Sequence, residues 1–133
     1  MRILGVGIDI TDIKVFRKRL DEGLINDLFL PGEIAYCSGR ARPWESYAGR
    51  FAAKEALFKA LGAGLQQGMR WKDVEITRQD TGAPGIRLTG GARSRADEMG
   101  SGSIHLSISH TRESAVAIVT IQSGVQPGME ETT

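Results

Sequence analysis

The chain has 133 residues, of which 41% are hydrophobic, enough for one core and too few for two comfortable domains. Its 17 Lys and Arg residues and 16 Asp and Glu residues give a net charge of +1, so no field of the whole molecule draws it to nucleic acid or to a membrane. The single Cys37 excludes an internal disulfide, and without a leader peptide or an apolar run of about 18 residues we expect a cytoplasmic protein.

The first predicted strand, Ile3–Ile10, has two different faces. One face carries Leu4, Val6, Ile8 and Ile10, and the other carries Gly5, Gly7 and Asp9. Glycine inside a strand marks a close approach by a ligand or by another backbone. Asp9 is therefore either a carboxylate beside a ligand or the end of a strand that packs on a helix and leads into a helix cap at Thr11 or Asp12.

An amphipathic helix is predicted from Asp12 to Asp21, with Ile13, Phe16 and Leu20 on its apolar stripe and Lys14, Arg17 and Lys18 off it. Short helices over Leu24–Phe29 and Gly32–Ser38 come next, and Cys37 is expected to be a small buried side chain. The loop Gly39–Pro43 carries Arg40 and Arg42. These arginines are either solvated or, together with Arg50, a cluster that grips phosphate.

The central helix is predicted over Gly49–Gly62, because strong helix formers fill it and a glycine stands at each end. Glu55 follows Phe51 by four residues and precedes Phe58 by three, so its carboxylate emerges between two aromatic rings, with Lys59 one turn further on. An ordinary ion pair of Glu55 and Lys59 on a solvated face is the alternative.

The second half of the chain supplies a hairpin, a helix and a strand pair. The hairpin comprises Val74–Thr77 and Gly85–Leu88, and the helix comprises Ala92–Met99. The strand pair comprises Ile104–His110 and Ala115–Ile121, which are joined by a turn at Thr111–Ser114. A flexible segment, Ser101–Ser103, precedes the pair. We expect an α+β fold in which a small antiparallel sheet packs with helices, a single domain over residues 1–122, and a flexible tail over residues 123–133.

Three segments carry a family resemblance: GVGIDI at Gly5–Ile10, GRFAAKEALFKALG at Gly49–Gly62, and LSISHT at Leu106–Thr111. In their order and separations they resemble the holo-[acyl-carrier-protein] synthases, the short form of the 4′-phosphopantetheinyl transferases, over roughly residues 3–121. The resemblance implies a 4′-phosphopantetheinyl transferase-like fold and transfer of phosphopantetheine from coenzyme A to a serine of apo acyl carrier protein. It also implies release of adenosine 3′,5′-bisphosphate, a magnesium ion, and a homotrimer with active sites between protomers.

The resemblance also assigns site residues. Asp9 and Glu55 would bind Mg²⁺, which takes one or two carboxylates together with phosphate oxygens and water. Lys59 would act in catalysis and on the phosphates, and we favour an electrostatic role for it over a proton-accepting one. The remaining positions expected to contact coenzyme A are Arg42, Arg50, Gly62, His110 and Thr111. Without the resemblance, His110 would be interpreted as a strand-end histidine bonded to a carbonyl.

One position departs from the family pattern: Val15 stands where many members carry an arginine that engages the carrier. We therefore expect the carrier to dock on Lys14, Arg17 and Lys18. For the trimer, we expect the glycine face of Gly5–Asp9 and the apolar Ala115–Ile121 to supply the contact surface. Two other classes of function remain open, namely a Mg²⁺-dependent enzyme that hydrolyses a nucleotide diphosphate, and a non-catalytic module that binds an acidic partner.

Overall fold

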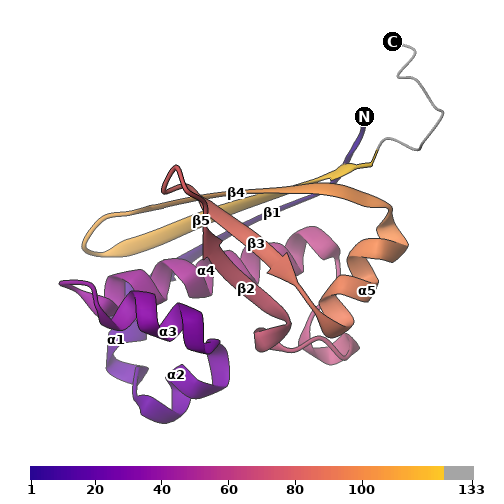
Figure 1. Ribbon diagram of the computed structural model, residues 1–133. Coiled ribbons are helices and arrows are strands. Elements are labelled where there is room, and N and C mark those ends of the chain that lie inside the picture. The colour runs from indigo at the N-terminus through magenta and orange to yellow at the C-terminus, as the bar shows by residue number, and fades with distance from the viewer. Residues whose placement is uncertain (125–133) are drawn as a thin grey trace.

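The computed structural model describes residues 1–124, which combine helices with strands (Figure 1). In chain order they are β1 (Ile3–Asp12), α1 (Ile13–Arg19), α2 (Glu22–Leu28), α3 (Pro31–Ser38), α4 (Pro43–Leu61), the 3₁₀ turns η1 (Leu65–Gln67) and η2 (Trp71–Asp73), β2 (Val74–Arg78), β3 (Pro84–Leu88), α5 (Gly90–Met99), β4 (Ser101–His110) and β5 (Ser114–Ser123). Most of the predicted tail lies outside the described residues, and its first residue, Ser123, belongs to β5.

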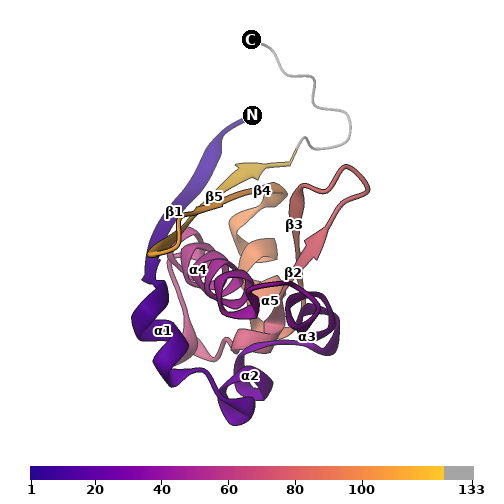
Figure 2. The ribbon, with the colours of Figure 1, turned by 90° about the vertical axis from the view of Figure 1, so that its left-hand side faces the viewer.

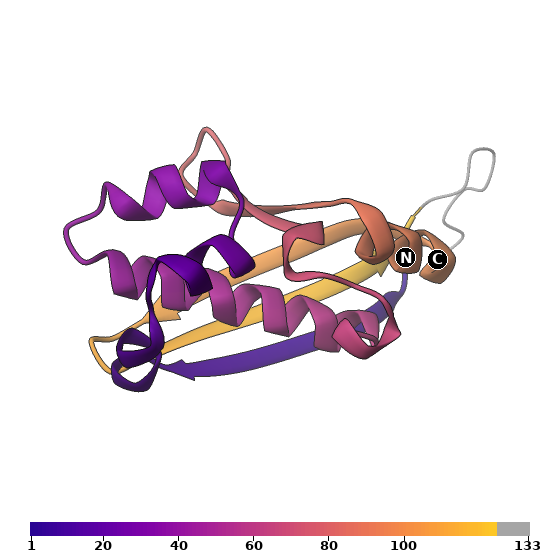
Figure 3. The same ribbon diagram turned by 90° about the horizontal axis from the view of Figure 1, so that it is seen from below.

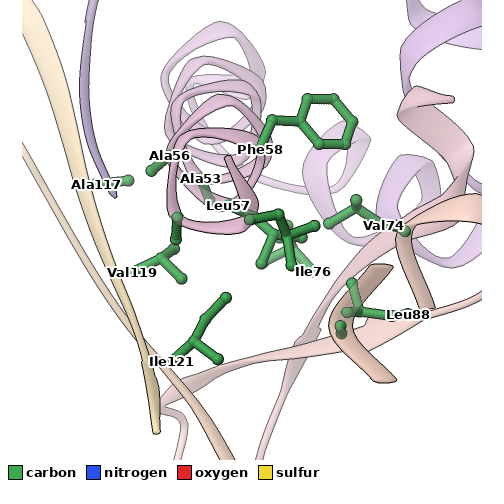
Figure 4. Packing of buried hydrophobic residues seen from close by; sticks show 14 of the residues in the cluster. Ala53, Ala56, Leu57, Phe58, Val74, Ile76, Leu88, Ala117, Val119 and Ile121 are labelled. Carbon is green, nitrogen blue, oxygen red and sulfur yellow. The ribbon is translucent and has the colours of Figure 1, made fainter. Parts of the chain in front are cut away.

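Helix α4 is the centre of the fold. The antiparallel sheet β1-β5-β4 lies on one side of it and the separate hairpin β2-β3 on the other (Figure 2). Leu57 of α4 packs in one cluster with Val119 of β5 and with Ile76 of β2 (Figure 4), so both sheets share this core. Helices α1, α2 and α3 gather where α4 begins (Figure 3). The expected α+β class is confirmed.

The glycine face of β1 is the one that packs on α4. A Cβ atom at Gly5 or Gly7 would overlap the backbone carbonyl oxygens of Ala60 and Ala56, so only glycine lets the helix come this close. The expectation that the glycine face forms the surface for a neighbour is therefore wrong. In the stretch Ala115–Ile121, four residues turn toward the core as well, namely Ala115, Ala117, Val119 and Ile121, whereas Ile118 is 41% exposed.

The opposite face of β1 is apolar and open. Val6, Ile8 and Ile10 are 56%, 58% and 68% exposed, and Ile118 lies opposite Ile8 in the register of β1 and β5. In Figure 1 the helices lie below the sheet, on its opposite face. Isolated apolar side chains on a surface need no explanation, but an aligned row on a sheet marks a contact surface.

Helix α4 is six residues longer than predicted at its N-terminus. It begins at Pro43, whose fixed φ and missing N–H suit the first turn of a helix, while Gly49 is buried inside it, where a Cβ would lie 3.1 Å from Cγ2 of Ile108. The glycine at position 49 thus serves helix-to-strand packing and does not mark a helix end. The predicted C-terminus is confirmed, since Gly62 adopts a left-handed φ of 68°.

Three shorter expectations have clear outcomes. The Asp12 side chain caps α1 by accepting a 3.0 Å hydrogen bond from the Val15 N–H, as predicted. Cys37 is buried, and burial raises the pKa of its thiol to about 11, which confirms an unreactive side chain. The prediction that Ser101–Ser103 is flexible is wrong, because Ser101 and Ser103 begin β4 and pair with β5.

Candidate active site

An acidic pair with a lysine lies where β1 meets α4. Asp9 is buried on the glycine face of β1, and Glu55 and Lys59 lie one turn apart on α4. Lys59 Nζ donates to Asp9 Oδ1 at 2.8 Å and to the Ile8 carbonyl at 3.0 Å. Asp9, Glu55 and Lys59, which were predicted to act together, therefore lie close to one another. The ion pair of Lys59 is with Asp9 on the strand, in place of the ordinary helical ion pair with Glu55.

The surroundings of Glu55 disfavour its charged form. Burial, together with the charge of the neighbouring Asp9 and a hydrogen bond shared with it, raises the pKa of Glu55 to about 7. The pKa of Lys59 is also raised, chiefly by its hydrogen bond to Asp9, so its ammonium group stays protonated at neutral pH. Two close carboxylates with an excess of negative charge fit a hard divalent cation, and a protonated Lys59 favours an electrostatic role over proton abstraction.

The raised pKa of Glu55 predicts a pH-dependent stability in metal-free protein. The folded state holds the Glu55 proton more tightly than the unfolded chain, so this contribution is fully present below the ordinary value of 4.5 and is lost as the pH rises through about 7. We expect the melting temperature to fall over this range and then level off. Thermal melts of wild type and Glu55→Gln check this: the variant should lose the Glu55-linked decline, and an unchanged decline would contradict the assignment.

Glu55 also opens onto an apolar groove of about 430 Å³ between β1, α1, α2 and η2. Its walls include Val15 and Phe16 of α1, Leu28 of α2, Phe51 of α4 and Trp71 of η2. The Trp71 ring lies 5.2 Å from both the Phe51 and the Phe58 rings, so the expected aromatic surroundings of Glu55 have a third member. Trp71 was not predicted, because no local pattern links η2 to the central helix.

A buried ion pair fixes these walls. Lys54, the residue before Glu55, is buried and donates to Glu33 Oε1 at 2.9 Å, to the Leu28 carbonyl at 2.9 Å and to the Trp71 carbonyl at 3.2 Å. It thereby ties α2, α3 and η2 to α4. Burying an ammonium group without such partners would be costly, which is why Lys54 holds several elements at once.

The predicted phosphate-gripping arginines lie on another side of α4. At about 100° per residue, Arg50 points about 140° away from Glu55 and about 180° away from Lys59. The buried Arg50 stacks on Tyr36 at 4.1 Å, and Arg78 of β2 and Arg40 stack on the same ring at 4.7 and 5.4 Å. Among the described residues, none of these three guanidinium groups has a carboxylate partner, which favours an anion site. Tyr36 and Arg78 were missed by sequence reasoning.

The other predicted contacts are also separated from the acidic pair within one chain. His110 ends β4, two strands away from β1, with its Nδ1 3.2 Å from the Thr111 carbonyl and 3.8 Å from Glu45 Oε1. The carbonyl contact is the one expected of an ordinary strand-end histidine. The Thr111 hydroxyl accepts the N–H groups of Glu113 and Ser114 and shapes the turn.

The remaining predicted positions lie near the two ends of α4. Arg42 is exposed at the N-cap of α4, and Gly62 follows its last turn, where Arg95 binds the Leu61 carbonyl. One chain therefore carries two separate groups of predicted site residues.

The basic face of α1 is exposed as predicted, but it points away from the groove. Arg17 stacks on Trp44 at 3.5 Å, and Lys14 and Lys18 lie in solvent. The residues of α1 that border the groove beside Glu55 are Val15, Phe16 and Arg19. Arg19 was not singled out from the sequence, although its spacing of four from Val15 places it on the same side of the helix.

No helix of residues 1–124 has the length and apolar character needed to cross a bilayer. No group of three or more His, Cys, Asp or Glu side chains there could hold a metal ion. A site with two carboxylates is the kind that Mg²⁺ uses when substrate phosphates and water complete its shell, so Asp9 and Glu55 fit this ion.

Comparison with known proteins agrees with this geometry. Residues 5–119 match the 4′-phosphopantetheinyl transferase superfamily. The holo-[acyl-carrier-protein] synthase of Geobacter sulfurreducens is 44% identical over 123 residues, which are 90% of this chain and 98% of that protein. The Bacillus anthracis holo-(acyl-carrier-protein) synthase, solved in complex with CoA (3′,5′-ADP), is 34% identical with a TM-score of 0.76 and covers 91% of this chain and 97% of its own. The chain therefore belongs to the 4′-phosphopantetheinyl transferase superfamily.

Proposed function

We propose that this protein transfers the 4′-phosphopantetheine group of coenzyme A to a serine of apo acyl carrier protein. The serine oxygen bonds to the phosphorus that carries the pantetheine, the diphosphate bond breaks, the serine proton passes to water, and adenosine 3′,5′-bisphosphate leaves. The observation that carries the proposal is the cluster of Asp9, Glu55 and Lys59, in which Glu55 also lines the apolar groove. The named function of the relatives and the coenzyme A bound to one of them support it.

The residues divide the chemistry between them. Asp9 and Glu55 would hold Mg²⁺, which when bound neutralises charge on the diphosphate. The Lys59 ammonium group stabilises the negative charge that grows on the transferring phosphate. The apolar groove beside Glu55 admits the carrier segment that presents the serine, and Arg19 at its border suits an acidic carrier.

Assembly completes the site in this proposal. The residues that would bind the coenzyme A phosphates, Arg42, Arg50, His110 and Thr111, lie apart from the acidic pair of their own chain. A neighbouring copy can bring its phosphate-binding group to the Asp9–Glu55 pair, and a homotrimer, as the resemblance implies, would supply three such sites. The exposed row of Val6, Ile8 and Ile10 is the surface through which the copies would associate.

Charge on this row should therefore dissociate the protein and inactivate it. We expect Ile8→Arg to reduce the mass in solution from that of a trimer to the 14.4 kDa of one chain and to lower transfer at least about tenfold. Multi-angle light scattering at the assay concentration measures the mass. Leu65→Arg is the matched control, because Leu65 is an exposed apolar residue of η1 away from the row. A wild-type chain that is active as a monomer would contradict the assembly.

One experiment decides among the three classes of function. Wild-type protein is incubated with coenzyme A, Mg²⁺ and an apo carrier, and the carrier mass and the nucleotide product are measured together. A heavier carrier with adenosine 3′,5′-bisphosphate supports the transferase. Hydrolysed diphosphate with an unchanged carrier indicates the hydrolase, and binding of the carrier without any product indicates the binding module.

A further inference from the structure

Thr11 lines the groove beside Glu55, and its hydroxyl is buried without a hydrogen-bond partner among residues 1–124. Thr11 is 7% exposed and, two residues after Asp9 on β1, points to the same side of the strand. Within residues 1–124, its Oγ1 is one of two buried side-chain atoms that lack a hydrogen bond, and the other, Arg50 Nε, belongs to the Tyr36 cluster.

A buried hydroxyl without a partner is unfavourable for folding. Valine has nearly the same shape and lacks the hydroxyl, so a purely structural position at Thr11 would favour valine. The polar atom therefore needs an explanation outside the free protein. Its position in the wall of a groove provides one, because rotation about χ1 would turn the hydroxyl, which is covered in the free protein, toward a ligand in the groove.

The other polar side chains of the groove have different positions. The Asp12 carboxylate accepts the Val15 N–H and caps α1, and Arg19 is exposed at the border. On the side of the groove that faces Asp9, the polar side chains are those of Glu55 and Thr11. Most of the remaining wall is apolar. A hydroxyl that enters through this wall would exchange its hydrogen bonds with water for bonds to these two residues.

We infer that Thr11 binds the attacking serine of the carrier: Thr11 Oγ1 accepts the hydrogen bond of the serine hydroxyl. The inference rests on the proposed function. With its hydrogen held by Thr11, the serine oxygen keeps its lone pairs free and aims one of them at the phosphorus. Thr11 is thus a residue that contacts and orients the acceptor substrate, and it has no role in binding coenzyme A.

The test compares Thr11→Val, which removes only the hydroxyl, with Thr11→Ser, which keeps it. We expect Thr11→Val to lower kcat/KM for the carrier about tenfold, the effect of one hydrogen bond, with KM for coenzyme A unchanged and the melting temperature equal or higher. Thr11→Ser should stay within about twofold of wild type in kcat/KM, since the bond is kept. Thr77→Val, on the half-buried face of β2, is the control and should leave all three values unchanged.

The outcomes separate this inference from the function on which it rests. Full carrier activity in Thr11→Val would overturn the role of Thr11 alone. A lower melting temperature in Thr11→Val, with activity toward carrier and coenzyme A falling together, would indicate a structural hydroxyl and also overturn it. A wild-type protein that loads no carrier would overturn the proposed function itself.

Discussion

Replacing Glu55 by Gln, or Asp9 by Asn, should lower carrier loading by about 1,000-fold or more, because a hard cation at a breaking diphosphate contributes several kcal/mol to the transition state. Each change keeps the size of the side chain and removes one carboxylate that would hold Mg²⁺. The rate is measured as carrier mass gain across a Mg²⁺ titration. Asp97→Asn is the matched control, because it removes an exposed carboxylate on α5 that pairs with Arg93.

The fold should survive both changes. Glu55→Gln removes a carboxyl whose ionisation is already disfavoured by burial and by Asp9, so the variant should be at least as stable as wild type at neutral pH. Circular dichroism and thermal melts check this independently of activity. Near-wild-type transfer by either variant at saturating Mg²⁺ would contradict the metal assignment. A variant that loses transfer because it no longer folds would not support the metal assignment either.

Replacing Lys59 by Ala should lower kcat by about 100-fold and change KM for coenzyme A much less, because a cation aimed at developing charge acts mainly in the transition state. Lys59 is exposed enough to reach a substrate, yet it is oriented by Asp9 at 2.8 Å. Steady-state kinetics with coenzyme A as the varied substrate separate the two parameters.

Lys72→Ala provides the comparison for Lys59, because Lys72 is an exposed lysine of η2. We expect it to leave kcat unchanged. An unchanged kcat with a raised KM in Lys59→Ala would instead make Lys59 a contact to the ground-state phosphates.

Local signals in the sequence predicted the acidic pair. The glycines around Asp9, the aromatic neighbours of Glu55 and the helical spacing to Lys59 each depend on residues a few positions apart, so periodicity brings them into view. The same holds for the cap at Asp12 and the helix end at Gly62. The start of α4 was missed because a buried glycine inside a helix has the same appearance in sequence as a glycine at its end.

The tertiary structure decided the rest, since it depends on contacts between segments far apart in the chain. Alternation in β1 separates Val6, Ile8 and Ile10 from the glycines, but only the approach of α4 shows that the glycine face is buried and the apolar row is exposed. The groove likewise exists because Lys54 holds α2 and η2 against α4. By itself the sequence predicted which side chains would carry the chemistry. Packing determined which surfaces remain open, because burial is a property of the whole fold.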